Sequence, residues 1–410
     1  MTPTPRAAVA LAVIGLAALV LPPGLSVALA LVLAAAIAAD GWSVRHAPEL
    51  DRSLPLTISR GAPTPLAVRA AADGHCVHLR QPPGPFLRVD QGQGRGSLDA
   101  SLVGMRRGRH LLPGVASASL GPLGLARVHH RSGPDVEVRV VTDVAGARRL
   151  MLRLRRTRAG LASGRALGPL GLGTAFESVR DYTTTDDIRQ LNARASARLG
   201  RPMSNQYRIE QDRELICVID CGRLMAAPLG ERTLLDIALD SVTALALAAD
   251  EFGDRFGVII FDDAVRRVLA PRHRGGTAAM EAIFDLHPRP VDSDFESAFV
   301  RVSRSHRALV FVFTDLLDDA AARSLVAGVS VLAHRHATCV VTAADPSLAA
   351  LAATAERPAA ALAALDMLAS RRQAALALKR QGAQVLEAQP QRLAERCLDA
   401  YLSAKLRARL

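Results

Sequence analysis

The sequence predicts an α/β fold whose main domain is a doubly wound parallel sheet, preceded by a membrane helical hairpin and a small β-sandwich domain. Three observations support this prediction. Two uncharged apolar stretches lie near the amino terminus, short β-like runs follow them, and from residue 215 onward buried-type strands alternate with helices. Such alternation is the pattern of a parallel sheet covered by helices.

Length and composition set the domain organisation. With 410 residues, half of them apolar, the chain can form two or three domains with large cores. We expect a transmembrane helical hairpin at 1–45, a β-sandwich at 46–155, a linker with a charged segment at 156–212, and the α/β domain at 213–410. The five cysteines are odd in number and favour reduced thiols over a disulfide framework.

The chain is basic, with a formal net charge of +12. This charge suits anionic lipid headgroups, nucleic acid or an acidic partner. Its Arg residues are scattered and no nucleic-acid-binding motif accompanies them, so we do not expect nucleic acid as a partner.

The predicted membrane hairpin consists of residues 7–21 and 25–39, which are almost wholly apolar and uncharged. Pro22-Pro23-Gly24 separates them, and proline and glycine favour a tight turn. Each arm is somewhat shorter than the ~20 residues that span a bilayer. A cleaved signal peptide is the alternative, but a second apolar arm argues against it. Arg6 and Arg45 flank the arms, so we expect a cell-membrane protein with two helices and cytoplasmic soluble domains.

The β-sandwich is predicted from short β-like runs that Pro and Gly punctuate at short intervals. These runs are 54–57, 66–70, 76–79, 97–102 and 136–141. A glycine-rich stretch at 92–96 could suggest a phosphate-binding loop. It follows no strong strand and opens no helix, so a hairpin turn is the better interpretation.

Buried-type strands of the α/β domain are continuous apolar runs that end in turns. The predicted strands are 215–219, 256–261, 308–313, 337–342 and 384–387, with a hairpin strand at 264–269. Helical spacing predicts helices at 233–252, 277–286, 294–302 and 358–381, and a last helix from Pro390.

Two of these strands end in aspartate, which predicts a site. Asp220 follows 215–219, and Thr314-Asp315 follows 308–313. In an open parallel sheet, ligands bind at the carboxyl ends of the strands, so both carboxylates can face one crevice. Two carboxylates beside hydroxyl groups suit a hard cation such as Mg²⁺.

This layout resembles the von Willebrand factor A domain and its metal-ion-dependent adhesion site. There the first strand ends Asp-x-Ser-x-Ser; here Asp220 matches the aspartate, but Gly222 and Leu224 stand at the serine positions. The site therefore resembles a degenerate version of that motif.

Two further positions complete the comparison. Asp315 resembles the last aspartate of the site, and Ser293 resembles its loop threonine, with Thr277 as a rival that is a better candidate for a helix N-cap. We expect any Mg²⁺ to be weakly bound, by Asp220, Ser293 and Asp315.

The wider pattern resembles the family of domain-of-unknown-function fifty-eight proteins. The residues that carry the resemblance are the charged segment 176–198, Phe-Glu-Ser-x-Arg through Ala-Ser-Ala-Arg, and 220–225, Asp-x-Gly-Arg-x-Met. Thr185 and Ala193 depart from the family pattern, which has glycine and tryptophan there. The resemblance implies partnership with a MoxR-type AAA+ ATPase. We expect the partner-binding residues to be Asp220, Gly222, Arg223, Arg180, Asp186, Asp187, Arg189 and Asn192.

The resulting function is a membrane-anchored scaffold or adaptor that works with such an ATPase in assembly or maturation of protein complexes. The alternative is a divalent-cation-dependent hydrolase or phosphatase that uses the strand-end aspartates. Against it, Gly222 stands where haloacid-dehalogenase-like phosphatases have a second aspartate, and no histidine is tied to Cys221 by sequence. No Gly-x-x-x-x-Gly-Lys loop occurs either, so we do not expect the chain to bind ATP in that way. Because the sequence offers no catalytic constellation, we expect no enzymatic activity.

Overall fold

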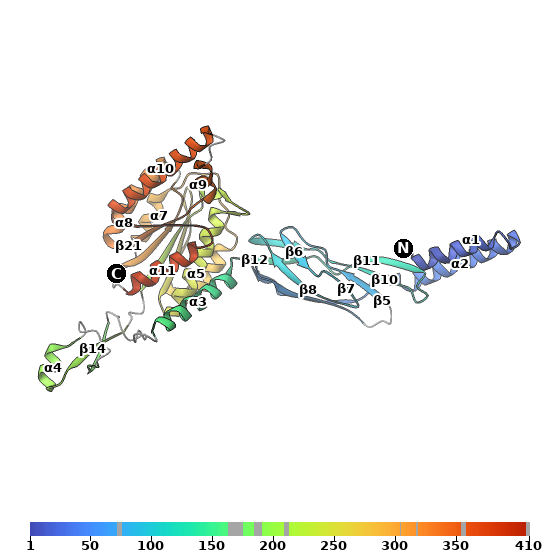
Figure 1. The fold of residues 1–410 in the computed structure, drawn as a ribbon, viewed down its shortest axis with the longest axis horizontal. Coiled ribbons are helices and arrows are strands. Elements are labelled where there is room, and N and C mark those ends of the chain that lie inside the picture. Colours follow the sequence, from blue (N-terminus) through green and yellow to red (C-terminus); the bar gives the residue numbers. More distant parts are fainter. Residues whose placement is uncertain are drawn as a thin grey trace. The chain divides into compact units, whose positions relative to one another are not determined.

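The structure of this protein is a computed structural model. It describes residues 1–71, 76–162, 175–183, 191–208, 213–303, 305–316, 319–353 and 358–406. The fold is mixed α/β with several sheets, and the chain divides into two compact units, Met1–Val141 and Thr142–Leu410 (Figure 1).

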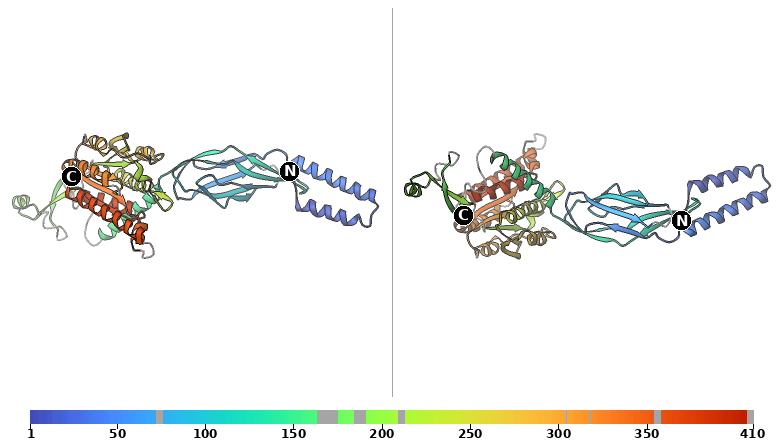
Figure 2. Two further views of the ribbon diagram at one scale, coloured as in Figure 1. Left: turned by 90° about the horizontal axis from the view of Figure 1, so that it is seen from above. Right: turned by 90° about the horizontal axis from the view of Figure 1, so that it is seen from below.

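The first unit begins with two apolar helices, α1 (Pro5–Ala17) and α2 (Pro23–Ser43), which form a hairpin (Figure 2). The side chain of Thr4 caps α1 by accepting a hydrogen bond from the backbone N–H of Ala7. By length and composition α2 could cross a membrane, whereas α1 is a shorter apolar helix. The described part of the chain thus contains one candidate span, and the second span of the expected hairpin stays a prediction.

Two sheets make up the rest of this unit. The nine-stranded sheet contains β1 (Thr2–Pro3), β2 (Leu50–Ser53), β4 (Thr64–Ala70), β5 (Cys76–Arg80), β6 (Leu87–Asp90), β7 (Gln93–Arg95), β8 (Ser97–Gly104), β10 (Val115–Leu120) and β11 (Ala126–Ser132). The three-stranded sheet contains β3 (Thr57–Ser59), β9 (Gly108–Leu112) and β12 (Val136–Val141). Buried side chains of both sheets, among them Leu66, Val68, Val138 and Val140, share one apolar cluster.

Four of the five β-like runs coincide with strands, but the prediction at 54–57 was wrong. Residues 54–56 connect β2 to β3, and Pro55 has no N–H for a strand ladder. The glycine-rich stretch forms β7 and its turn into β8, with Gly96 at a φ of 70°. A positive φ is the backbone that glycine adopts without strain, so the expected hairpin turn is confirmed.

The second unit begins with α3 (Val144–Ala162). Ala147 and Met151 of this helix are buried in the same apolar cluster as α5, and the hydroxyl groups of Thr142 and Thr243 are 2.7 Å apart. The boundary expected at residue 155 therefore falls inside α3, because apolar residues in its first half pack against the α/β domain.

The charged segment forms β13 (Ala175–Asp181) and α4 (Ala193–Leu199), and β14 (Met203–Arg208) follows it. β13 and β14 pair in an antiparallel two-stranded sheet. Asn192 caps α4 by accepting a hydrogen bond from the N–H of Ala195, and the hydroxyl of Ser196 accepts one from the N–H of Met203. The Asn-x-x-Ala-Ser part of the segment therefore stabilises its own hairpin.

A six-stranded sheet forms the centre of the second unit, in the order β19–β18–β15–β20–β21–β22. Its strands are β15 (Glu214–Asp220), β18 (Arg255–Phe261), β19 (Val265–His273), β20 (Ala308–Phe313), β21 (Ala337–Ala343) and β22 (Gln384–Ala388). All are parallel except β19, which pairs antiparallel with β18 as the predicted hairpin strand. β15 lies between β18 and β20, so the strand order reverses there.

Helices cover both faces of this sheet (Figure 1). On one face, α3, α5 (Leu234–Phe252), α6 (Gly276–Ile283) and α11 (Leu393–Leu406) share an apolar cluster with Leu215, Cys217 and Ile219. On the other, α7 (Phe295–Val302), α8 (Asp319–Arg335) and α10 (Pro358–Arg380) pack against Ile216 and Val218. Burial on both faces explains why β15 is continuously apolar.

Short elements complete the unit. They are the 3-10 helix η2 (Arg223–Ala226), the strand pair β16 (Pro228–Leu229) and β17 (Arg232–Thr233), and α9 (Pro346–Ala352). All five cysteines are free, and four are buried.

Candidate functional site

The carboxylate of Asp220 lies at the carboxyl end of β15 and is almost fully buried. Its Oδ1 accepts hydrogen bonds from the Ser293 hydroxyl at 2.5 Å and from the Gly222 N–H at 2.8 Å. Its Oδ2 accepts one from the Thr314 hydroxyl at 2.7 Å. Both carboxylate oxygens are thus engaged by donors from three separate loops.

The loop that brings Ser293 to Asp220 is held to the end of β15 by backbone hydrogen bonds. The N–H of Arg289 donates to the carbonyl of Cys221, and the N–H of Arg223 donates to the carbonyl of Val291. Beyond this loop, Asp294 caps α7 by accepting from the N–H of Ser297. The cap and the backbone pairs fix the position of the Ser293 hydroxyl.

Asp315 is the second strand-end carboxylate, and it is also buried. Its Oδ1 accepts hydrogen bonds from the N–H of Leu316 at 2.8 Å, from the Thr342 hydroxyl at 3.2 Å, and from the guanidinium of Arg371. Arg371 comes from α10 and also donates to the carbonyl of Ala343. Its side chain is only 4% exposed, so this is a buried ion pair.

Burial sets the electrostatics of the crevice. It raises the pKa of Asp220 above its ordinary value, and the negative charge of Asp315 adds to the rise, against the three hydrogen bonds that favour the ionised form. The positive charge in the crevice comes from Arg371, which pairs with Asp315.

Ion pairs with exposed members lie on the Asp220 side of these buried groups and form a rim there. Arg223 donates to Asp292 at 2.5 Å, and both side chains are largely exposed. The guanidinium groups of Arg266 and Arg289 contact the buried carboxylate of Asp262 at 2.8 and 3.2 Å. Although burial raises the pKa of Asp262, hydrogen bonds from Arg266 leave it below its ordinary value. The crevice rim therefore presents charged groups on fixed loops.

The structure brings Asp220, Gly222 and Ser293 into direct contact and places Asp315 close by. Thr277, the rival of Ser293, lies in the first turn of α6, and Gly275 takes the N-cap position expected for it. Arg223, which was also predicted to bind the partner, lies on the rim next to Asp220, whereas the other predicted partner-binding residues lie elsewhere.

Those remaining residues belong to the charged segment. Arg180 lies on β13, where its guanidinium donates to the carbonyl of Asp181, and Asn192 caps α4. Asp186, Asp187 and Arg189 lie outside the described residues.

The oxygen ligands of this crevice do not make a complete Mg²⁺ site. Mg²⁺ requires near-octahedral oxygen coordination, and in the described part of the chain no three acidic, histidine or cysteine side chains gather as a metal would need. Asp315 Oδ2 has no hydrogen-bond partner among the described residues, but Arg371 already neutralises that carboxylate. Weak Mg²⁺ binding stays a prediction, for which Asp220, Ser293 and Asp315 would be the ligands.

Arg371, Thr314 and Thr342 are site residues that sequence reasoning missed. Thr314 was part of a predicted strand end, but its hydroxyl was not assigned to Asp220. Arg371 lies in an Ala/Leu-rich helix, on the same stripe as the buried residues Ala364 and Leu378. A lone arginine within an apolar stripe of period 3.6 was the signal that could have identified it.

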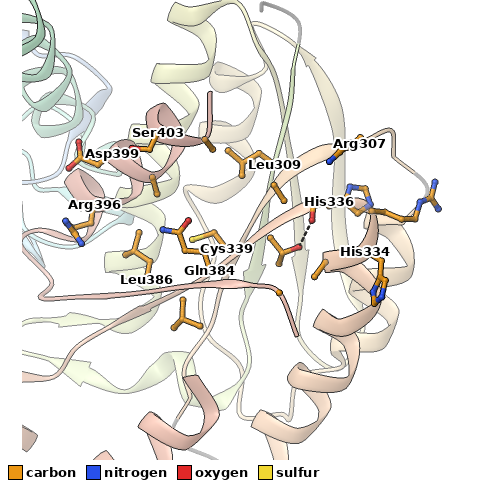
Figure 3. A pocket seen from close by; sticks show the side chains of 18 of the residues that line it. Arg307, Leu309, His334, His336, Cys339, Gln384, Leu386, Arg396, Asp399 and Ser403 are labelled. Carbon is orange, nitrogen blue, oxygen red and sulfur yellow. Dashed lines mark hydrogen bonds between the residues drawn. The ribbon is translucent and has the colours of Figure 1, made fainter. Parts of the chain in front are cut away.

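A separate cavity of about 560 Å³ lies at the amino-terminal ends of β20, β21 and β22 (Figure 3). Its lining includes Arg307, His336, Gln384 and Arg396. His336 accepts a hydrogen bond from the N–H of Ala308 at Nδ1, so its neutral ring carries the proton on Nε2. Burial, and secondarily the charge of Arg335, lowers the pKa of His336. None of the predicted site residues lines this cavity.

The second unit is thus an α/β domain in which buried, hydrogen-bonded polar side chains gather at the carboxyl ends of the central strands β15 and β20. Residues 178–358 match the family model described as "Protein of unknown function DUF58". This match over 178–358 agrees with the family resemblance that the charged segment and residues 220–225 predicted.

Other comparisons add little. One similar solved structure is an uncharacterized membrane spanning protein from Vibrio fischeri, 13% identical, with 47% of this chain and 97% of that chain covered. Its TM-score of 0.16 is too low to support a conclusion about the fold. No functionally curated protein matches the chain.

Proposed function

We propose that this protein is a membrane-anchored adaptor that binds another protein at the crevice between the ends of β15 and β20. One observation carries the proposal: the buried carboxylates of Asp220 and Asp315 are already engaged, while charged side chains stand exposed around them. The hydrogen bonds and the ion pair of the two buried carboxylates hold the surrounding loops in place and so fix the shape of the surface. Charged groups on a fixed surface provide specificity in protein recognition.

The same geometry favours binding over hydrolysis. A nucleophile or general base needs a free lone pair near the reacting atom. Asp220 accepts three hydrogen bonds, and the Asp315 oxygen that contacts Arg371 accepts two more. The hydrolase alternative would have to use Asp315 Oδ2, which has no hydrogen-bond partner among the described residues, and Arg371 already neutralises that carboxylate.

The strand order supports a von Willebrand factor A-like interpretation of this domain. β15 is the point where the strand order reverses, and ligands of open parallel sheets bind at that point, outside the carboxyl ends of the strands. In the proposed domain Gly222 stands in place of a serine ligand, and Arg371 supplies the positive charge beside Asp315. Partner binding would then depend little on Mg²⁺.

The anchor of the proposed adaptor is the apolar hairpin of α1 and α2. Both arms would enter the membrane, and positively charged flanks such as Arg6 and Arg45 would keep the soluble units on the cytoplasmic side. The resemblance to the family implies a MoxR-type AAA+ ATPase as the partner, which is a cytosolic protein and would meet the crevice there.

The proposal is tested by binding of a purified MoxR-type ATPase from the same organism to the full chain in lipid nanodiscs. Reversing the rim charge with Arg223→Glu should weaken binding by about tenfold, which corresponds to about 1.4 kcal/mol. The matched control is Arg109→Glu, which breaks another exposed ion pair, with Glu137 of the first unit. Equal affinities for wild type and Arg223→Glu would contradict the crevice as the binding face.

Mg²⁺ and turnover are measured in the same experiment. We expect the affinity of wild type to change little when Mg²⁺ is replaced by a chelator, with the ATPase held in a nucleotide-free state. Hydrolysis of a generic phosphate ester that is lost on Asp220→Ala would favour the hydrolase alternative instead.

A further inference from the structure

Asp40 is an acidic residue in the last turn of the apolar helix α2, and its side chain is 2% exposed. A carboxylate there is unfavourable in two ways. It is costly to bury near a bilayer, and its charge opposes the helix dipole at the carboxyl end. Hydrogen bonds to the Asp40 carboxylate are therefore needed to offset these two costs.

Those contacts come from the turn between β10 and β11. Asp40 Oδ1 accepts a hydrogen bond from the N–H of Leu123 at 2.7 Å, and Oδ2 accepts from Leu125 at 2.7 Å and Ala126 at 2.8 Å. A β-carbon on Gly121 would meet the Asp40 carboxylate at 2.3 Å, so glycine is needed for this approach. Three hydrogen bonds to one carboxylate fix the turn to the end of α2.

The start of α1 is fastened to the same turn. The hydroxyl of Thr4 donates to the carbonyl of Gly124 at 2.6 Å, and the N–H of Thr4 donates to the carbonyl of Leu125 at 2.9 Å. Both ends of the apolar hairpin that face the β-strands are therefore bonded to residues 121–126. The turn lies at the level where the hairpin would enter and leave a bilayer.

Side chains at this level have the composition of a membrane interface. Trp42 is 68% exposed and Leu123, at the tip of the turn, is 60% exposed. The guanidinium of Arg45 lies 4.2 Å from the centre of the Trp42 ring, and the exposed Arg6 lies beside Gly124. Tryptophan and arginine with apolar neighbours are the residues found at the boundary between headgroups and acyl chains.

We propose that the β10–β11 turn is a membrane-contacting element, which inserts Leu123 into the boundary between headgroups and acyl chains of an anionic bilayer. Arg6 and Arg45 contact the lipid phosphates beside it, and Asp40 is the positioning residue that holds the turn at this depth. The inference rests on the proposed membrane anchoring, because the bilayer that the turn contacts is the one that α1 and α2 enter. A single exposed leucine is common on protein surfaces and is not by itself evidence of a function. The evidence here is that Leu123 is held in a fixed position beside the apolar hairpin.

The experiment uses the only tryptophan of the chain, Trp42, as a depth probe. The full chain is reconstituted into vesicles of phosphatidylcholine and phosphatidylglycerol that carry bromine atoms at shallow or deep acyl positions. A second variant, Trp42→Phe/Leu123→Trp, moves the probe to the turn. A third, Trp42→Phe/Leu111→Trp, is the control, because Leu111 is 56% exposed but lies beyond the opposite end of β10.

We expect the probe at position 123 to be quenched by shallow bromines about as strongly as Trp42, and several-fold more strongly than the probe at 111. Adding Asp40→Asn should reduce quenching at position 123 and leave Trp42 quenched. If Trp42 is quenched but position 123 behaves like position 111, the inference fails while the anchor stands. If Trp42 is not quenched and the protein does not co-sediment with vesicles, the anchoring itself fails.

Discussion

The hydroxyl of Ser293 occupies the space that a β-carbon on residue 222 would need. An ideal β-carbon at Gly222 would come within 2.1 Å of Ser293 Oγ, the same atom that donates to Asp220 Oδ1 at 2.5 Å. Gly222 therefore makes room for a hydroxyl group from a distant loop. Asp220 is satisfied even though the serine of the resembled motif is missing.

Gly222→Ala and Ser293→Ala should each destabilise the crevice, but not additively. The first forces a clash, at a cost of about 1–3 kcal/mol, and the second removes a hydrogen bond to a buried carboxylate, at a similar cost. In the double variant the Oγ that causes the clash is absent, so the total should be less than the sum. Hydrogen exchange of peptides from β15 measures the change.

The control for this cycle is Ser330→Ala, which removes a hydroxyl that donates to the carbonyl of Ala327 on an exposed part of α8. It should leave exchange in β15 unchanged. Strict additivity of Gly222→Ala and Ser293→Ala would show that the two residues do not compete for one space.

Arg371→Ala should destabilise the second unit strongly. It leaves the Asp315 carboxylate buried without its positive partner, and breaking a buried pair costs about 3–5 kcal/mol. Arg372→Ala, on the exposed side of the same helix, should cost less than about 0.5 kcal/mol. Thermal unfolding followed by circular dichroism compares the two.

Thermal unfolding of wild type and Arg371→Ala in the presence of Mg²⁺ tests whether Arg371 keeps the ion out. With the guanidinium removed, Asp220, Ser293 and Asp315 become available to a cation, so Mg²⁺ should stabilise Arg371→Ala more than wild type. Stabilisation of wild type by Mg²⁺ to the same degree would show that the ion binds without displacing Arg371.

The sequence predicts the sheet of the second unit well but its crevice only in part. The apolar runs that became β15, β18 and β20 identify central strands because burial on both faces leaves no polar positions. The positions of Asp220 and Asp315 at the ends of two of these strands can therefore also be predicted from the sequence. The partners of these carboxylates come from loops and a helix distant in sequence, and local patterns do not encode such tertiary contacts.

Arg371 and Asp40 show this limit most clearly. Asp40 is the one charged residue of α2, and Arg371 is the one charged residue on the buried stripe of α10. Local preference gives no reason for either. Arg371 pairs with Asp315 just beyond the end of β20, and Asp40 pairs with the β10–β11 turn, so each is explained only once the fold brings the elements together. Isolated charges on apolar helix faces are the positions where sequence patterns should prompt a search for a distant partner.

The stability of the second unit should fall as the pH decreases below the ordinary pKa of histidine, in part because of His336. Burial lowers the pKa of His336, so the unfolded chain binds its proton more readily than the folded chain. The contribution of neutral His336 to the free energy of unfolding is fully present above about pH 6.5. It is lost as the pH falls through the lowered pKa of His336 in the folded state.

His336→Asn tests this assignment, because asparagine can still accept the hydrogen bond from the Ala308 N–H but does not titrate. Its exchange in β20 and β21 should depend less on pH between about 5 and 7.5 than that of wild type. His334→Asn, at an exposed position of α8, should keep the wild-type dependence. A steeper dependence in His336→Asn would reverse the sign of the proposed linkage.

Asn192→Ala should reduce the stability of α4. Its effect on ATPase binding then tests how the charged segment acts in partner binding. Loss of the N-cap costs about 1 kcal/mol, which is large for a helix of seven residues. Asn192→Asp keeps the cap, and Arg194→Ala, at an exposed position of the helix, leaves it intact. Exchange of the 193–199 peptide should therefore quicken only in Asn192→Ala. If ATPase binding also weakens in Asn192→Ala but not in Asn192→Asp, the segment acts through its folded hairpin; if both weaken equally, the amide itself contacts the partner.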